Sequence, residues 1–171
     1  ERLGSTPDLL LLHWPKPQPE LAETIAALNE AKDKGLTRAI GLSNYPSALW
    51  QTAQDLSASK LVTNQVEYHP MLSINALKAK AAELGSSLTA WSPLARGLVL
   101  DEPIILAIAE KYGKTAGQVT LRWIIQQGLI AIPKTANEAR AAENLNIFDF
   151  ELTNDEIALM AGLARGYRVG D

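Results

Sequence analysis

The stretch RAIGLSNYPS, residues 38–47, decides how the chain is expected to fold. It begins as a short apolar run of the length of a buried strand and ends in the polar pair Ser43-Asn44. Pro46 and Ser47 follow directly and are typical of the start of a helix. The stretch therefore predicts one β/α unit, with polar side chains at the carboxyl end of its strand.

Four further stretches repeat this order of strand, polar end and helix, and five such units favour a parallel sheet with right-handed crossovers. Of these stretches, Asp8–His13 predicts a strand buried on both faces. With no linker or low-complexity tract, residues 1–171 are expected to form a single domain. The other expected strands are Asp8–His13, Val62–Glu67, Ser87–Trp91 and Leu129–Ile132, and the expected helices are residues 20–34, 46–56, 73–84, 103–112, 116–127, 137–144 and 154–163.

Two sheets are compatible with five such units: an open doubly wound sheet and a barrel. An open sheet that binds a dinucleotide predicts a G-x-G-x-x-G loop, which the sequence lacks. Polar residues instead follow every expected strand, as in a TIM barrel, whose sites draw on successive strand ends. A complete barrel needs eight strands and about 250 residues. We therefore expect an α/β fold of the (β/α)8 class, of which this chain holds five units.

Composition excludes several classes of function. The formal net charge is -3, so the chain carries no excess of basic residues with which to bind nucleic acid. It has no cysteine, which excludes disulfides, thiolate nucleophiles and cysteine-bound metals. Its two histidines, His13 and His69, do not form a metal motif, and no metal is expected. No apolar run has the roughly 20 residues of a membrane span, and we expect a cytoplasmic protein.

Six motifs in order resemble the aldo-keto reductase family, and they extend over nearly the whole chain. The match is closest in character to the bacterial 2,5-diketo-gluconate reductase-like branch. The motifs are LHWP at residues 12–15, IGLSNY at 40–45, NQVEYHP at 64–70, AWSPL at 90–94, IPKT at 132–135 and RAAEN at 140–144.

The resemblance implies that the chain is a C-terminal portion covering about strands 4–8 of the barrel. The family's catalytic aspartate, tyrosine and lysine would then lie outside it. His13 matches the histidine of the catalytic tetrad, which orients the substrate carbonyl, and Trp14 would line the substrate pocket. The motif also implies that Tyr68 is not the catalytic tyrosine and that His69 is a structural residue of a loop.

The resemblance also implies an NADPH site, whose nicotinamide end comes first in the chain. Ser43, Asn44 and Gln65 match residues that hydrogen-bond the carboxamide, for which hydroxyl and amide groups are suitable partners. Ser43 and Asn44 have a second interpretation, as caps of the helix that follows. Trp91 would stack on the nicotinamide ring. Ser92 and the backbone of Leu94 would contact the pyrophosphate.

The other end of the cofactor is assigned to residues after the last expected strand. Lys134, Thr135 and Arg140 match a site for the 2′-phosphate, and two cations with a hydroxyl suit a phosphate dianion. Asn137 would add a hydrogen bond or cap the next helix. The alternative is a solvated helix in which Arg140 pairs with Glu143. Glu143 and Asn144 also match contacts to the adenine.

The resemblance implies NADPH-dependent reduction of an aldehyde or ketone by a protein that is monomeric at full length. The 171-residue chain alone would be inactive without the other tetrad residues. Its partners would be NADPH and a small carbonyl substrate, with no nucleic acid or membrane. A noncatalytic NADP-binding regulatory subunit of the same fold is the main alternative, and a different phosphate-binding barrel enzyme, such as an isomerase or aldolase, is the other.

Overall fold

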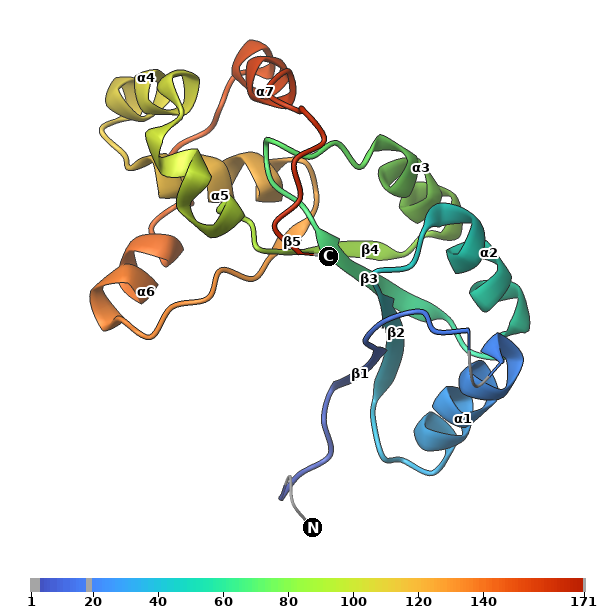
Figure 1. Ribbon diagram of the computed structural model, residues 1–171. Helices are drawn as coiled ribbons and strands as arrows, with labels where there is room; N and C mark the ends of the chain where they lie inside the picture. The colour runs from blue at the N-terminus through green and yellow to red at the C-terminus, as the bar shows by residue number, and fades with distance from the viewer. Residues whose placement is uncertain (1–3, 18–19, 171) are drawn as a thin grey trace. The chain divides into compact units, whose positions relative to one another are not determined.

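The computed structural model describes residues 4–17 and 20–170 and has an α/β fold. The strand order in its sheet follows the sequence, and the pairings of β1 with β2, β2 with β3, and β4 with β5 are parallel (Figure 1). A doubly wound sheet reverses its strand order at a switch point, whereas a barrel wall does not. The strands are β1 (Leu9–Leu12), β2 (Ala39–Ser43), β3 (Leu61–Glu67), β4 (Ser87–Trp91) and β5 (Ile130–Ala131).

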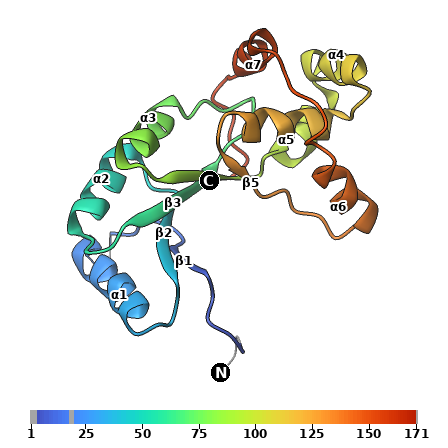
Figure 2. The same ribbon diagram turned by 180° about the vertical axis from the view of Figure 1, so that it is seen from behind.

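The chain divides into two compact units. The first unit is Glu1–Val66 with Asn75–Leu88, and the second unit is Glu67–Ile74 with Thr89–Asp171. In the first unit, helices α1 (Leu21–Asp33), α2 (Ser47–Leu56) and α3 (Asn75–Leu84) lie on the same side of the strands in both views (Figures 1 and 2). Its buried apolar side chains include Ile25, Leu28, Ile40, Leu42, Trp50, Ala53 and Leu61.

Gly41 allows β2 to lie close to both of its neighbours. A Cβ at this position would be 2.7 Å from the carbonyl oxygen of Thr63 and 2.9 Å from a methyl carbon of Leu11. The register between β2 and β3 also shifts between Ile40 and Leu42, on either side of this glycine. A residue without a side chain therefore fits where the backbones of β2 and β3 come closest.

The burial of β1 differs from the sequence prediction. Leu9 and Leu10 are 39% and 38% exposed, so the expectation of a strand buried on both faces is wrong for this half of β1. Within the residues that the structure describes, β1 pairs with β2 along one edge and is the first strand in the sheet order. The remaining strands of the first unit are covered by its three helices and are more deeply buried.

The second unit is mainly helical. Its 3₁₀ segment η1 spans Ala95–Asp101, and its α-helices are α4 (Pro103–Tyr112), α5 (Ala116–Gln126), α6 (Glu138–Leu145) and α7 (Asn154–Ala161). Thr115 begins α5 with a capping box, in which its hydroxyl accepts from the backbone of Gln118 and the Gln118 side chain accepts from the backbone of Thr115. Every residue of α5 from Ala116 to Ile124 is buried.

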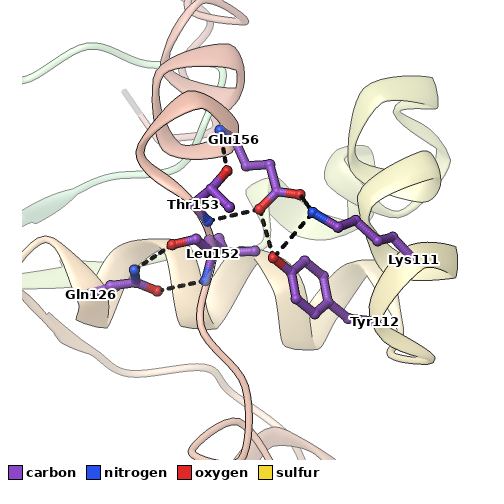
Figure 3. A network of polar contacts seen from close by, with 6 residues as sticks. All are labelled: Lys111, Tyr112, Gln126, Leu152, Thr153 and Glu156. Atoms are coloured by element: carbon purple, nitrogen blue, oxygen red, sulfur yellow. Dashed lines mark hydrogen bonds and ion pairs between the residues drawn. The ribbon is translucent and has the colours of Figure 1, made fainter.

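A polar network joins the end of α4 to the start of α7 (Figure 3). The carboxylate of Glu156 accepts hydrogen bonds from Lys111 at 2.6 Å, from Tyr112 at 2.8 Å and from the backbone N–H of Thr153 at 2.8 Å. Beside it, the side chain of Gln126 hydrogen-bonds both the backbone N–H and the carbonyl of Leu152. These bonds connect the chain before α7 to α4 and α5.

Most expected elements occur within two residues of their predicted bounds. β5 has two residues rather than the four expected, although each of its bounds lies within one residue of the prediction, and η1 was not expected. Arg96 and Gly97 in η1 both have positive φ, of 52° and 101°, so this segment has no regular helical periodicity to detect in the sequence. Across the described ranges, no helix is long and apolar enough to cross a membrane.

Candidate functional site

In the first unit, the carboxyl ends of β1, β2 and β3 carry a hydrogen-bonded group of polar residues. The Ser43 hydroxyl donates to the carbonyl of Gln65 at 2.8 Å. The Asn44 amide donates to the Ser43 hydroxyl at 3.1 Å and to the carbonyl of His13 at 2.9 Å. Since His13 is 31 residues from Asn44, the fold brings together polar positions that the sequence predicted separately. We call His13, Ser43, Asn44 and Gln65 the strand-end cluster.

The backbone of Asn44 contributes to this arrangement. Asn44 has a φ of 65°, in the left-handed region that asparagine tolerates better than most residues. Its backbone N–H donates to the carbonyl of Gln65 at 2.9 Å. Helix α2 begins after Pro46 without a side-chain cap, so the interpretation of Ser43 and Asn44 as its caps is wrong. Their side-chain hydrogen bonds to the Gln65 and His13 carbonyls join the strand ends instead.

Asn64 stabilises the turn that follows β2, a role that the sequence analysis missed. Its buried side chain accepts from the backbone N–H of Tyr45 at 3.3 Å and donates to the Tyr45 carbonyl at 2.8 Å. Asn64 has no exposed surface, and a buried amide must be hydrogen-bonded to avoid a large desolvation cost. A polar residue inside the apolar run of an expected strand was the available signal.

The first two candidate residues, His13 and Trp14, are both exposed. Trp14 is 41% exposed, and its ring lies 6.3 Å from that of His13 in a tilted arrangement. Trp14 also lines a small cavity of about 130 Å³ together with Lys16, Tyr45 and Leu49. An exposed imidazole at a strand end is accessible to a small molecule, as proton transfer or substrate orientation requires.

In the second unit, Trp91 ends β4 and the chain then turns sharply. Trp91 is partly exposed, and its carbonyl accepts from the backbone N–H of Tyr68 at 3.3 Å. Ser92 has a φ of 48°, and its carbonyl accepts from Ala95, while that of Leu94 accepts from Gly97. Positive φ values make this loop tight. Its backbone groups are therefore suited to contact a ligand closely.

The loop after β5 is organised by Thr135 and Asn137. The Thr135 hydroxyl accepts from the backbone N–H of Asn137 at 3.0 Å, and the Asn137 side chain caps α6 by accepting from the backbone N–H of Arg140. Lys134 and Arg140 are exposed, and their side chains make no hydrogen bond or ion pair within the described part of the chain. Both cations are therefore available to an anion.

Asn144 and Thr135 line an apolar pocket of about 290 Å³ beside this loop, whereas Glu143 makes other contacts. The Glu143 carboxylate accepts from the Thr115 hydroxyl at 2.6 Å. The sequence analysis gave an ion pair between Glu143 and Arg140 as an alternative. The described residues do not form this ion pair, and Glu143 bonds Thr115 instead. The pocket is otherwise lined mostly by apolar side chains, namely Leu121, Ile125, Ala131, Pro133, Ala141, Leu145, Ile147 and Phe148.

Tyr68 and His69, which the resemblance places outside the catalytic group, are both buried. Tyr68 stacks on Trp123 with a ring separation of 5.1 Å, and burial raises the pKa of its phenol well above 10 despite a hydrogen bond to Gln127. Such a phenol is a poor proton donor at neutral pH. Over residues 4–17 and 20–170, no group of three His, Asp or Glu side chains is placed to bind a metal.

Comparison with known proteins gives consistent matches. The profile of the Aldo/keto reductase family matches residues 1–165. An aldo-keto reductase of Mycolicibacterium smegmatis is 42% identical over 95% of this chain and 60% of its own length. A crystal structure assigned as a 2,5-diketo-D-gluconic acid reductase B is 46% identical, with a TM-score of 0.93 over 96% of this chain and 59% of that chain.

A solved structure also bears on the cofactor. A Bombyx mori aldo-keto reductase in complex with NADP is 35% identical to this chain, with a TM-score of 0.91 over 99% of this chain and 62% of that chain. The present chain thus spans about three fifths of the length of the curated relatives that it matches.

Proposed function

The chain belongs to the aldo/keto reductase family, and from this premise we propose that it serves the NADPH-dependent reduction of an aldehyde or ketone to an alcohol. Hydride moves from the nicotinamide to the carbonyl carbon, and a proton moves to the carbonyl oxygen. The observation that carries the proposal is the strand-end cluster, because its amide and hydroxyl groups are complementary to a nicotinamide carboxamide. The NADP complex of the Bombyx mori relative supports the choice of cofactor.

At the nicotinamide end, we assign hydrogen bonds with the carboxamide to Ser43, Asn44 and Gln65. Their backbone and side-chain bonds to one another support this role, since side chains that are already fixed lose little entropy when they bind a ligand. Trp91 stacks on one face of the nicotinamide ring and leaves the other to the substrate. Ser92 and the backbone of Leu94 contact the pyrophosphate, in keeping with the tight turn at these residues.

At the adenosine end, we assign the 2′-phosphate to Lys134, Thr135 and Arg140. The exposed cations support this assignment, because Lys134 and Arg140 need not break an existing ion pair to bind a phosphate. Asn137 orders the loop through its cap of α6 and can add a hydrogen bond. The adenine occupies the apolar pocket beside Asn144. We also assign an adenine contact to Glu143, whose carboxylate accepts a hydrogen bond from Thr115.

His13 is the tetrad histidine in this proposal, and Trp14 borders the substrate. The five β/α units correspond to the fourth to eighth units of one (β/α)8 domain, and the Asp, Tyr and Lys of the tetrad belong to the first three. The share of its relatives' length that this chain spans supports that correspondence. The complete protein acts as a cytoplasmic monomer on a small carbonyl compound.

Titration of the complete protein with NADPH and with NADH tests the proposal, with quenching of tryptophan fluorescence as the signal. We expect saturable quenching by NADPH and an affinity at least about tenfold lower for NADH, which lacks the 2′-phosphate. Absence of saturable quenching by either nucleotide would rule out the cofactor site. NADPH binding without oxidation by any aldehyde or ketone would instead favour the noncatalytic NADP-binding subunit.

A further inference from the structure

Glu67 is a buried carboxylate that the proposed hydride transfer does not use. Its side chain is 1% exposed, at the end of β3. It accepts hydrogen bonds from His69 Nε2 at 2.9 Å, from the backbone N–H of Val169 at 2.6 Å and from the backbone N–H of Gly170 at 3.2 Å. Val169 lies 102 residues further along the chain. Three donors on one carboxylate compensate for the cost of removing it from water.

His69 takes part as a neutral donor. Its side chain is fully buried, and burial lowers the pKa of the imidazole, although the hydrogen bond and the charge of Glu67 raise it and the charge of Arg168 lowers it. Nδ1 has no hydrogen-bond partner among residues 4–17 and 20–170, so the proton on Nε2 is the one that serves Glu67. Among the described residues, the His69 imidazole therefore depends on Glu67 for its one hydrogen bond.

The segment that Glu67 binds, residues 165–170, follows α7 and contacts two other parts of the second unit, to which it belongs. The backbone N–H groups of Arg165 and Tyr167 both donate to the carbonyl of Met71, at 3.1 and 3.2 Å. At its other end, Gly170 lies directly against the Trp91 indole, and a Cβ built on this glycine would overlap the ring. Figure 1 shows this segment, in red, returning from α7 to the region of β4 and β5.

We propose that Glu67 is a positioning residue that holds residues 165–170 against the Trp91 ring. The carboxylate fixes the backbone of Val169 and Gly170, and the fixed backbone limits the orientations open to the indole. For its effect on the cofactor, the inference rests on the proposed function, in which the nicotinamide lies on Trp91. Glu67 then acts on NADPH through Trp91 without touching the nucleotide.

Limited trypsin digestion tests the attachment of the segment without reference to any cofactor. Arg165 and Arg168 are exposed, and cleavage after them requires the segment to leave its place. Glu67→Gln has one acceptor oxygen and an amide donor where the carboxylate has two acceptors. We expect cleavage at these bonds to be at least about tenfold faster in Glu67→Gln. Unchanged cleavage would overturn the proposal.

Two further variants keep this measurement decisive. Glu110→Gln makes the same charge change on the exposed face of α4 and should leave the cleavage rate unchanged. If Glu67→Gln fails to fold, Val169→Pro removes the N–H that forms the 2.6 Å bond and leaves the Glu67–His69 pair intact. It should release the segment in the same way, and protection equal to that of the parent chain would contradict the proposal.

A double-mutant cycle tests the effect on the cofactor in the complete protein. Glu67→Gln should raise the Kd for NADPH about fivefold when Trp91 is present and should have little effect in a Trp91→Phe background. An equal increase in both backgrounds at unchanged Tm would show that Glu67 does not act through Trp91, and would overturn this part. If the parent protein binds no NADPH, the proposed function fails, and the digestion alone decides whether Glu67 holds the segment.

Discussion

At the scale of the residue, the second unit contains two kinds of charged side chain with different uses. The Glu67 carboxylate is buried and fully engaged, whereas Lys134 and Arg140 are exposed and have no protein partner among the described residues. A buried charge without partners costs several kcal/mol, so Glu67 must be satisfied internally. Exposed cations stay solvated until an anion binds, which makes them suitable for ligand recognition.

Replacement of either cation should weaken NADPH binding selectively. We expect Lys134→Met or Arg140→Gln to raise the Kd for NADPH about tenfold, because under the proposed function each removes a charge-assisted hydrogen bond to the 2′-phosphate. The Kd for NADH should change less than twofold, and fluorescence titration of the complete protein with both nucleotides measures this. Lys34→Met, at the exposed residue that directly follows α1, is the control. An equal rise in Kd for NADPH and NADH would contradict the assignment of these residues to the 2′-phosphate.

At the scale of the element, close contacts between neighbouring segments set the geometry of both units. In the first unit, β2 approaches β3 through Gly41, and Asn64 joins the end of β3 to the turn after β2. In the second unit, Glu156 joins α7 to α4. Each contact depends on one residue whose neighbours cannot easily move to compensate for its loss.

Gly41→Ala should destabilise the chain. The added Cβ would be 2.7 Å from the backbone oxygen of Thr63, and a backbone atom inside a sheet cannot move aside as a flexible side chain can. We expect the free energy of unfolding to fall by about 2–3 kcal/mol, measured by urea denaturation. Gly128→Ala offers a comparison, since space around that glycine is open and only its positive φ opposes the change. If Gly41→Ala left the free energy of unfolding unchanged, β2 and β3 could separate without loss of stability.

Glu156 should make stability depend on acidic pH. Partial burial raises the pKa of this carboxyl, but hydrogen bonds from Lys111, Thr153 and Tyr112 outweigh it and lower the pKa from 4.5 to about 2. The folded-state pKa lies below the unfolded value, so this stabilisation is complete above about pH 4.5 and is lost as pH falls towards 2.

Glu156→Gln should therefore cost on the order of 2 kcal/mol at neutral pH and progressively less as the pH approaches 2. Thermal or urea unfolding across this range measures the difference from the parent chain. Glu151→Gln is the control, because this carboxylate is 80% exposed and its ion pair with Arg122 should contribute little. A loss of stability in Glu156→Gln that does not depend on pH would show that the charge of the Glu156 carboxylate does not cause the stabilisation.

At the scale of the whole molecule, the five β/α units leave apolar residues exposed on the first and last strands of the sheet order. Leu9 and Leu10 of β1 are more than a third exposed, and Ile130 of β5 is 51% exposed. In a closed barrel both edges are paired and such residues face other elements. This exposure agrees with the proposal that three further β/α units complete the barrel.

The 171-residue chain alone should not reduce carbonyl compounds, because under the proposed function it holds His13 without the other tetrad residues. We expect no loss of NADPH absorbance above background with an aldehyde substrate, while the complete protein turns over. As a matched control, the complete protein with His13→Ala, prepared in the same way, should also lose activity. Measurable turnover by the 171-residue chain would mean that the proton donor is misassigned.

The sequence by itself determined the order of the β/α units and the positions of most strand ends. These features depend on local signals: apolar runs, helix starts such as Pro46, and glycines such as Gly35 and Gly85 that adopt a positive φ after a helix. The candidate residues at the ends of β2, β3 and β4 were predictable for the same reason, since polar residues directly follow the apolar runs.

Only the tertiary structure decided which polar groups pair with one another. Asn44 bonds His13 from 31 residues away, Asn64 bonds the backbone of Tyr45, and Glu67 binds a segment 102 residues beyond it. A buried polar group must find a partner, but its neighbours along the chain do not identify that partner. The partner is selected by the packing of distant elements, which is why the role of Glu67 becomes visible only in the folded chain.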